Sequence, residues 1–395
     1  MNITVNATSL HNAMALLCTV ARRNPRTILE YVCLELGRDC VTLCATNMDV
    51  SLRIDVPIIR DGIREYGSAV CIQAAWLLAA LKGKKGDVTL ITEGADVTVQ
   101  VGGALSSATT MSCEDFPVVQ FNVDAFANTP ATPVVDVTFE SAVLRDAIAR
   151  VLPAMARTDE VRSSLQHIRL QVADDETCVM EASDGRRHHR VMPRITAIRS
   201  IANMSVYLSG TSAGILLKML APKRDAPRGV AVLRSSGIFT SVTVGGQTLM
   251  NRADVHRYPD IEKYVPTGYG ISARFDGVAL ARALALVPII QIGTGKDRET
   301  MPVRLEIAGG QITLAVCGEN GRPAYRATAP GMLALDTCPA DYIIAVNPTY
   351  LADGVKAAAC AGGEITLQFV DPLQMVRLDG NGFRGLIMPV RIKRP

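Results

Sequence analysis

The chain has 395 residues, of which 48% are hydrophobic and only 5% are aromatic. This length exceeds that of a single hydrophobic core, so we expect two or three domains with mainly aliphatic interiors. The 41 basic and 38 acidic residues leave a formal net charge of +3, which does not by itself indicate a nucleic-acid-binding protein. A charged fraction of 20% excludes, on composition, a disordered chain.

The ten cysteines include no Cys-x-x-Cys pair. Cys40 and Cys44 are the two closest in sequence, and no paired histidines follow them at zinc-ligand spacing. We therefore predict small buried thiols, with neither a metal site nor a cofactor, in a reduced cytoplasmic protein. The N-terminus shows no signal-peptide pattern and the longest apolar stretches are too short to cross a bilayer, so no membrane association is expected.

Three segments repeat one pattern, a short alternating strand followed by an amphipathic helix. The strands are predicted at 3–5, 135–139 and 271–275, and the helices at 9–17, 141–148 and 278–284. Leu10, Leu144 and Leu280 are equivalent in this pattern. A second helix recurs in each repeat, at 74–81, 212–220 and 349–359, with Leu77, Leu216 and Leu351 as equivalent positions. The sequence therefore predicts a domain triplication.

Short strands bounded by Gly and Asp lie between the predicted helices; examples are 41–44, 88–91, 97–101, 311–316 and 365–368. Two helices per repeat cannot cover so many strands on both faces, so we predict an α+β fold with helices and antiparallel sheets in separate layers. Junctions rich in Pro, Gly, Asn or Thr, near 122–133 and 263–270, predict domains at 1–126, 127–262 and 263–395.

Every predicted helix carries or is followed by basic residues, whereas its acidic residues are few. The cations are Arg22, Arg23, Arg26, Lys82, Lys84, Lys85, Arg145, Arg150, Lys218, Lys223, Arg224, Arg282 and Lys356. If the helices face a common cavity, these side chains make it positive and suited to sequence-independent contact with phosphate oxygens. Ordinary solvated helix faces, with cations favoured near C-termini by the helix dipole, are the alternative. No aromatic residues are interleaved with the cations, which argues against base stacking on single strands.

Three short segments carry a further pattern: Ser-Asp-Gly-Arg-Arg-His at 183–188, Arg-Tyr-Pro-Asp-Ile at 257–261 and Ile-Met-Pro-Val-Arg-Ile at 387–392. The Asp-Gly step in the first segment predicts a tight turn with positive φ at Gly185. In order and spacing the three segments resemble the bacterial DNA polymerase III beta subunit, the beta sliding clamp family, and the resemblance extends over nearly the whole chain. It implies three clamp domains, each with two helices lining an inner face and antiparallel sheets outside.

The resemblance also implies a non-catalytic processivity factor that acts in DNA replication. Such a protein is a ring-shaped homodimer that encircles duplex DNA without sequence preference. It docks the replicative polymerase, the clamp loader and repair proteins, which bind through short linear motifs.

In that family the three segments converge on a peptide-binding pocket. The resemblance assigns to it Leu165, Ser183, Gly185, Arg186, Arg187, His188, Pro259, Lys263, Tyr264, Asn347, Tyr350, Met388, Pro389, Val390 and Arg391. Leu165 and Met388 are expected to form apolar walls, and Arg187 and Arg391 to meet a peptide carboxylate or carbonyl.

The chain departs from the family pattern at four points. His188 stands where the family has Leu, and Ser163 and Ser164 stand where it has an aromatic pair. Residues 393–395 extend beyond the terminal motif, and the pI of 8.3 contrasts with the usually acidic clamps. These departures allow an alternative, a plasmid, phage or resistance copy of the clamp with altered partners.

Catalytic motifs are not complete in the sequence. Gly293-Thr294-Gly295-Lys296 hints at a phosphate-binding loop, but Asp297 stands where that motif requires Ser or Thr. A metal-dependent hydrolase using Asp184, His188 and His189 is the alternative from a different class. It is disfavoured because adjacent residues of a strand point to opposite faces. We therefore predict no catalytic residues and no metal ligands.

Overall fold

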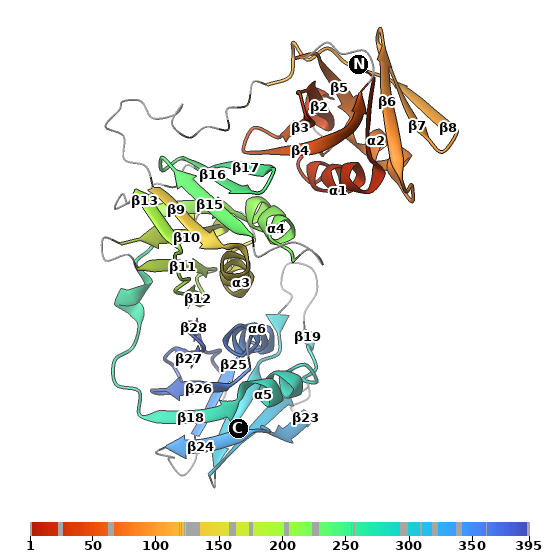
Figure 1. Cartoon of the computed structure of the whole chain (residues 1–395). Helices are drawn as coiled ribbons and strands as arrows, with labels where there is room; N and C mark the ends of the chain where they lie inside the picture. The colour runs from red at the N-terminus through yellow and green to blue at the C-terminus, as the bar shows by residue number, and fades with distance from the viewer. Residues whose placement is uncertain are drawn as a thin grey trace. The chain divides into compact units, whose positions relative to one another are not determined.

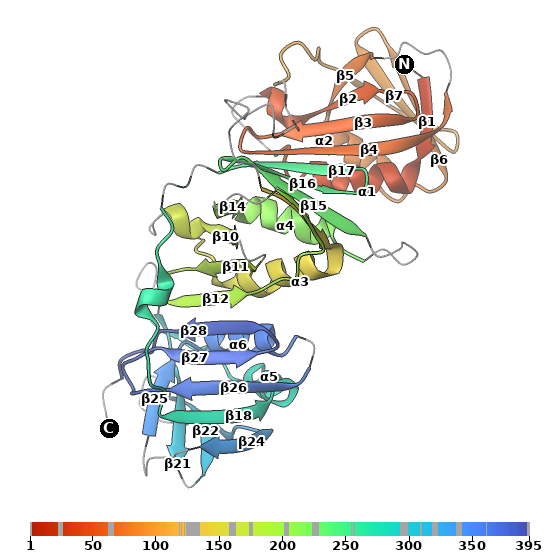
Figure 2. The same ribbon diagram turned by 60° about the vertical axis from the view of Figure 1, so that its left-hand side comes forward.

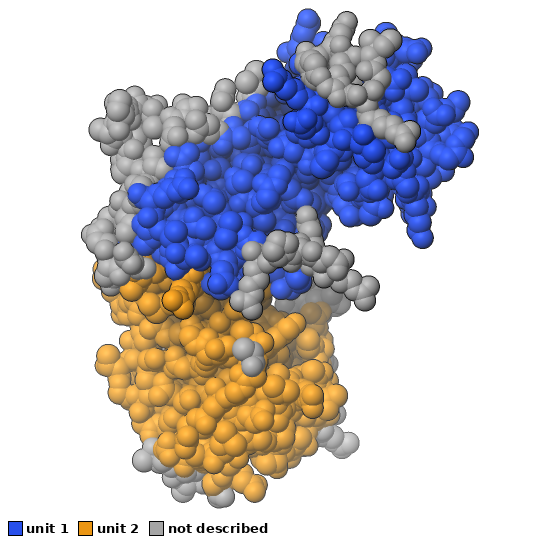
Figure 3. Space-filling model, in the orientation of Figure 1, with its two compact units in different colours: residues 1–145, 172–176, 195–254 blue, residues 146–171, 177–194, 255–395 orange. Residues whose placement is uncertain are grey.

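The structure is a computed structural model that describes residues 2–22, 27–61, 67–117, 119, 121, 123, 135–157, 163–173, 177–200, 205–222, 229–253, 255, 257–292, 299–308, 310–317, 323–336, 342–360 and 362–392. The chain divides into two compact units (Figure 3). Unit 1 comprises residues 1–145, 172–176 and 195–254, and unit 2 comprises residues 146–171, 177–194 and 255–395.

A strand leading into a helix recurs six times along the described chain (Figure 1). The pairs are β1 Asn2–Asn6 with α1 Ala7–Leu17, β5 Ala69–Gln73 with α2 Ala74–Leu81, β9 Val135–Glu140 with α3 Ser141–Val151, β14 Ser205–Ser209 with α4 Gly210–Met219, β18 Ile271–Asp276 with α5 Gly277–Leu284, and β25 Tyr342–Val346 with α6 Pro348–Ala358. The predicted triplication, with two helices in each repeat, is confirmed.

Polar residues at the ends of these strands start the helices. The side chains of Asn6, Ser209, Asp276 and Asn347 accept hydrogen bonds from backbone N–H groups in the first turns of α1, α4, α5 and α6. Each such residue satisfies a donor that the helix itself leaves unpaired. The change from strand to helix is therefore encoded locally.

Unit 1 contains one large antiparallel sheet with the strand order β13-β9-β15-β16-β17-β4-β1-β6-β7-β8. Its further strands are β13 Ala197–Ser200, β15 Val230–Ser235, β16 Phe239–Val244, β17 Gln247–Arg252, β4 Val50–Asp61, β6 Asp87–Glu93, β7 Asp96–Val101 and β8 Ala104–Thr109. A branch runs from β4 through β3 Cys40–Thr46 and β2 Tyr31–Leu36 to β5, and η1 Thr27–Glu30 precedes β2. Because β17 pairs with β4, strands of the first and second repeats share this sheet (Figure 2).

Unit 2 contains the strand order β10-β11-β12-β28-β27-β26-β18-β24 and a second sheet, β23-β22-β21-β25. The bounds are β10 His167–Val172, β11 Cys178–Ser183, β12 Arg187–Val191, β28 Phe383–Ile387, β27 Val376–Gly380, β26 Glu364–Phe369, β24 Met332–Asp336, β23 Pro323–Thr328, β22 Gln311–Cys317 and β21 Val303–Ala308, with a short pair β19 Gln291–Ile292 and β20 Glu299–Thr300. Three 3-10 turns complete it: η3 Leu152–Ala154, η4 Ser163–Gln166 and η5 Ile261–Tyr264. Helices α5 and α6 pack together, and α6 contacts β27 and β28.

The cores follow the repeat. All six leucines that the sequence marks as equivalent are at most 1% exposed: Leu10, Leu77, Leu144, Leu216, Leu280 and Leu351. Burying a leucine side chain contributes roughly 1.5–3 kcal/mol, so these positions fix each helix on its sheet. Within the described residues, no helix is long and apolar enough to span a membrane.

The domain boundaries stay a prediction. The boundary at 126/127 lies outside the described residues, and the one at 262/263 falls within η5. The two compact units do not follow the repeats, because the β4–β17 and β12–β28 pairings each join strands of neighbouring repeats.

Candidate functional site

The turn between β11 and β12 is held by side-chain-to-backbone hydrogen bonds. Ser183 Oγ donates to the Arg187 carbonyl at 2.7 Å, and Asp184 Oδ1 accepts from the N–H groups of Arg186 and Arg187 at 2.9 Å each. Gly185 has a φ of +83°, which glycine adopts without steric cost. The tight Asp-Gly turn that the sequence predicts is confirmed.

The C-terminal segment lies against this turn. Strand β12 pairs with β28, with His188 opposite Leu386 (Figure 2). Beyond β28, the Met388 N–H donates to the Arg186 carbonyl at 2.8 Å, and the Val390 N–H donates to the Ala345 carbonyl at 2.7 Å. Backbone hydrogen bonds therefore bring together two of the three segments that the sequence singles out.

The third segment reaches the same place through η5. Glu262 in η5 forms ion pairs with Arg190 on β12 and with Arg384 on β28. Burial raises the pKa of Glu262, but the two guanidinium groups outweigh burial and hold its pKa below the ordinary value. These pairs anchor the segment that contains Pro259 to the strands that carry the other two.

The three segments and η4 enclose a cavity of about 510 Å³ in unit 2. The predicted residues that line it are Leu165, Ser183, Gly185, Arg186, Arg187, His188, Pro259, Tyr264 and Met388. Ile261, Met375 and Leu386 also line it, and the sequence analysis did not select them. Met375 directly precedes β27, the strand that pairs with β28, so a prediction of strand pairing near the C-terminus could have indicated it.

The Arg187 side chain is held by bonds to three other residues. Its side chain is 8% exposed, Nε donates to Asp184 at 3.0 Å, Nη1 donates to Asp353 at 2.7 Å, and Nη2 donates to the Pro153 carbonyl. The guanidinium carbon lies 4.2 Å from the ring centroid of Tyr350. Arg187 therefore braces the turn against α6, and its contact with a peptide carboxylate stays a prediction.

The remaining predicted pocket residues are absent from the cavity lining: Lys263, Asn347, Tyr350, Pro389, Val390 and Arg391. Asn347 caps α6, and Lys263 forms an exposed ion pair with Asp260 at 3.2 Å. Val390 and Arg391 are exposed. Arg391 is thus accessible on the C-terminal segment that also supplies Met388.

His188 and Glu181 form a buried pair behind the cavity. They are 2% and 3% exposed, and His188 Nε2 lies 3.0 Å from Glu181 Oε2. Arg169 also pairs with Glu181, and its guanidinium carbon lies 4.9 Å from the ring centroid of Tyr258, next to Pro259. Burial raises the pKa of Glu181, but His188 and Arg169 outweigh burial and hold its pKa below the ordinary value. One ring nitrogen of His188, Nε2, is therefore bonded within the protein, whereas Nδ1 is buried without a hydrogen-bond partner among the described residues.

His189 lies on the opposite side of β12 from His188. Its Nδ1 donates to the Arg150 carbonyl at 2.8 Å, and complete burial lowers its pKa to about 3. Asp184 is bonded within its own turn. The three side chains of the hydrolase alternative therefore do not converge on a common site.

Most of the predicted DNA-contacting cations that the structure describes are exposed: Arg22, Lys82, Lys84, Lys85, Arg145, Lys218, Arg282 and Lys356. No described residue forms an ion pair with any of these side chains. Arg23, Arg26, Lys223 and Arg224 lie outside the described residues.

Arg150 differs from these exposed cations. Its side chain is buried, with Nε donating to the Ala357 carbonyl at 2.8 Å and Nη2 donating to the Asn381 carbonyl at 2.8 Å and to the Gly380 carbonyl at 3.3 Å. A guanidinium that serves three backbone carbonyls is not available to phosphate. Arg150 therefore joins α3 to α6 and to the β27–β28 turn.

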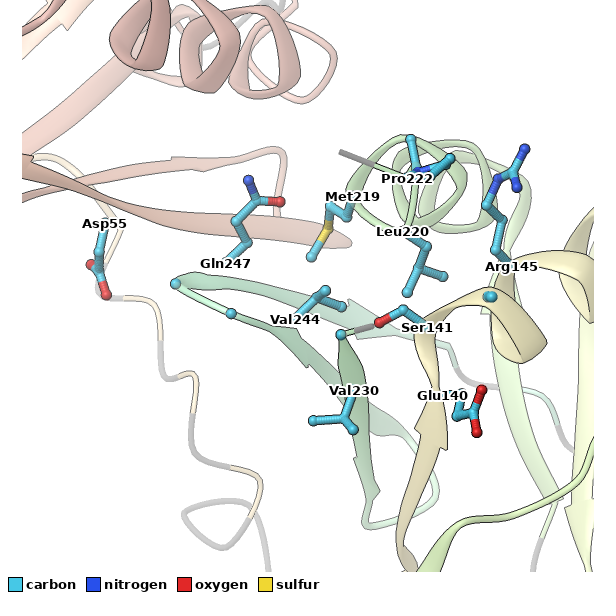
Figure 4. A pocket seen from close by; sticks show the side chains of 15 residues that line it. Asp55, Glu140, Ser141, Arg145, Met219, Leu220, Pro222, Val230, Val244 and Gln247 are labelled. Atoms are coloured by element: carbon cyan, nitrogen blue, oxygen red, sulfur yellow. The ribbon is translucent and has the colours of Figure 1, made fainter. Parts of the chain in front are cut away.

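A second cavity, of about 760 Å³, lies within unit 1 (Figure 4). Met219 and Leu220 at the end of α4 lie above Val244 on β16, and Arg145 also belongs to the lining. The sequence analysis did not predict this cavity, because its walls come from segments whose apolar residues are typical of any core.

The structure also brings together cysteines that the sequence analysis treated as unrelated. The sulfurs of Cys33, Cys71 and Cys113 all lie within 4.8 Å of one another. Cys33 is 80 residues from Cys113 and Cys71 is 42 residues from it, so a search for short ligand spacings could not find this cluster.

Comparison with known proteins finds similarity to sliding clamps. Residues 1–120 match the family described as DNA polymerase III beta subunit, N-terminal domain. The chain is 22% identical over 404 residues to the beta sliding clamp of Streptococcus pneumoniae, with 99% of this chain and 96% of that relative covered.

Solved clamp structures share the fold. The DNA polymerase sliding clamp of Bacillus subtilis superposes with a TM-score of 0.83 at 14% identity, covering 100% of both chains. The DNA polymerase III subunit beta of Pseudomonas aeruginosa gives 0.81 at 19% identity, covering 99% of this chain and 100% of that one. These likenesses confirm the predicted α+β clamp fold, and the comparisons do not favour the hydrolase or specialised-copy alternatives.

Proposed function

We propose that the chain is a DNA sliding clamp of the DNA polymerase III beta subunit family and a non-catalytic processivity factor, since residues 1–120 match that family and the chain is 22% identical to a beta sliding clamp. In this proposal two copies form a ring around duplex DNA and dock partner proteins through the cavity of unit 2. The observation that carries the docking proposal is the convergence of the 183–187 turn, Pro259 and the C-terminal segment on one cavity.

The cavity suits an extended peptide with apolar anchors. Its volume of about 510 Å³ lies within the range of small ligand sites. Leu165, Met375 and Met388 supply apolar wall, and methionine adapts to several partner side chains. We expect peptides with Gln and paired Leu or Phe residues to bind, since such motifs bury their anchors while pairing their backbone. The replicative polymerase, the clamp loader and repair proteins are the expected sources.

Two neighbouring residues allow a matched test of the docking site. Met388 and Val390 are 40% and 38% exposed on the same segment, but only Met388 lines the cavity. Met388→Ala should weaken binding of a fluorescent Gln/Leu/Phe peptide about tenfold, since removing part of a buried anchor contact costs on the order of 1.5 kcal/mol. Val390→Ala should stay within about twofold of the intact protein.

A pair of deletions extends this test. Removing residues 388–395 should abolish peptide binding, whereas removing only 393–395 should preserve it. Equal binding by both deletion variants would mean that the C-terminal segment is structural only. Peptide binding that survives Met388→Ala unchanged would place the docking site elsewhere.

The DNA proposal rests on the exposed cations and the family. Contacts with phosphate make binding steeply salt-dependent, with a slope of about −0.9 per neutralised phosphate. Replacing Lys82, Lys84 and Lys85 together by Ala should flatten the slope by up to about 3 and weaken binding equally on unrelated duplexes. Arg326→Ala is the control, because Arg326 is already paired with Glu306. An unchanged salt slope in the triple variant would show these lysines to be an ordinary solvated surface.

The homodimer proposal is tested by measuring the mass of the protein in solution. Sedimentation equilibrium should give twice the chain mass of 42.3 kDa at micromolar concentration. A ring built from two copies needs two equivalent contacts between the first repeat of one copy and the third repeat of the other. A strict monomer at that concentration would contradict the ring.

A further inference from the structure

Three cysteines from separate segments meet at one edge of unit 1. Cys33 on β2 and Cys71 on β5 are direct cross-strand partners. Met111 pairs with Cys71 through two backbone hydrogen bonds of 2.9 and 3.1 Å, which place Cys113, two residues further on, beside both thiols. Cys113 Sγ lies 3.2 Å from Cys71 Sγ and 3.5 Å from Cys33 Sγ.

These thiols do not belong to the aliphatic core of unit 1. Val32, Leu34 and Leu36 occupy the buried face of β2, and alternation places Cys33 on the other face. Cys71 is fully buried, whereas Cys33 and Cys113 are half-buried. The cluster therefore has a shielded floor and a side open to solvent, unlike isolated cysteines that fill a core.

We propose that Cys33, Cys71 and Cys113 bind a thiophilic metal ion of the Zn²⁺ class. Tetrahedral zinc with Zn–S bonds of about 2.3 Å holds its sulfurs roughly 3.8 Å apart. The observed separations of 3.2 and 3.5 Å differ from that value by about 0.6 and 0.3 Å, and the third edge of the triangle is at most 4.8 Å, so metal binding needs shifts of less than about 1 Å. Thiolate sets of this kind select zinc over hard cations such as Mg²⁺.

Two described side chains neighbour Cys33, although neither belongs to the group whose ligand atoms all lie within 4.8 Å of one another. Cys44 on β3 is the cross-strand partner of Cys33 on its other side. Glu35 follows Cys33 by two residues, so it stands on the same face of β2 and is exposed. Water, or either side chain after a change of rotamer, would supply the fourth ligand. The metal would cross-link β5, which pairs with β2, to the segment after β8.

The test uses the full-length protein, fully reduced and freed of metal. Titration with Co²⁺ should produce a thiolate-to-cobalt charge-transfer absorption that saturates at one equivalent per chain, and one equivalent of Zn²⁺ should displace it. Mg²⁺ should produce no competition. Cys113→Ser should lower zinc affinity by more than about 100-fold, since even outer-shell changes cost 10–100-fold. Cys360→Ser, which alters an exposed thiol of unit 2, should bind as the parent protein does.

Folding of the variants is measured by the fluorescence of Trp76, which lies in α2 of unit 1 and is the sole tryptophan of the sequence. A measurement on the unmutated protein keeps the test independent of variant folding. Zinc should protect Cys33, Cys71 and Cys113 from alkylation, read by mass spectrometry, and leave Cys360 reactive. Absence of a cobalt–thiolate band in the reduced protein, parent-like binding by Cys113→Ser, or alkylation unchanged by zinc would each overturn the proposal.

Discussion

Replacing Arg150 by Ala should loosen unit 2 without acting through DNA. The substitution removes the donor for the carbonyls of Ala357, Gly380 and Asn381. The Ala357 carbonyl lies in the last turn of α6, where the helix supplies no partner of its own. Asn381 has a φ of +49° in the tight turn between β27 and β28, so the guanidinium also secures this turn.

The expected loss of stability follows from the burial of the guanidinium and the carbonyls that it bonds. Hydrogen bonds from a charged donor contribute about 1.5–3 kcal/mol each, and breaking a buried charged network costs about 3–5 kcal/mol in total. The ion pair with Asp146, half of whose side chain is exposed, adds little. We therefore expect Arg150→Ala to destabilise the α3–α6–hairpin region by about 3–5 kcal/mol.

Hydrogen exchange measured by mass spectrometry is the suitable assay, because a chain with two compact units need not unfold in one step. Peptides covering β27 and β28 should lose protection by about 100-fold or more, while peptides from β6 and β7 in unit 1 serve as an internal reference. Arg145→Ala is the matched control on the same helix, exposed and without a described ion-pair partner. Arg145→Ala should change the opening free energy derived from hydrogen exchange by less than about 0.5 kcal/mol. Unchanged exchange in Arg150→Ala together with reduced DNA retention would refute this reasoning.

Three further perturbations test local features of the fold. Burial lowers the pKa of His189 to about 3, so on acidification the unfolded chain binds the proton before the folded chain does. The contribution of His189 to stability is therefore complete above about pH 6.5 and falls by about 2.7 kcal/mol at pH 4.5. His189→Gln should flatten this pH dependence in acid denaturation curves. Gly185→Ala should lower the free energy of unfolding in urea titrations by about 1–2 kcal/mol, because residue 185 has a positive φ. Gly214→Ala in α4 is the control and should be neutral or stabilising, because an added methyl group there meets no atom within 4 Å. Equal effects of the two substitutions would mean that the turn relaxes. Asn347→Ala should cost about 1 kcal/mol by uncapping α6, and Asn347→Asp should restore it; a neutral Ala variant would show that water replaces the cap.

The helices, the strands and their repetition could be predicted from local sequence patterns. Helix periodicity and the spacing of Leu10, Leu144 and Leu280 are local properties, and all three positions are buried as the repeat requires. The Asp-Gly step predicted the tight turn at Gly185, since few residues other than glycine adopt its φ. The order of three short segments was sufficient to predict the family and the α+β fold, and with them the neighbourhood of the candidate cavity.

The contacts of individual side chains within that neighbourhood became known from the three-dimensional structure alone. Arg145 and Arg150 share one helix and one charge, yet Arg150 is committed to carbonyls 207 and 231 residues away. Arg187 is equally committed to Asp353, and Met375 enters the cavity lining through strand pairing. The cysteine cluster arises in the same way, from cross-strand register and one backbone bridge. Local patterns encode backbone conformation because it depends on near neighbours, whereas the partner of a buried polar group is set by packing between segments distant in sequence.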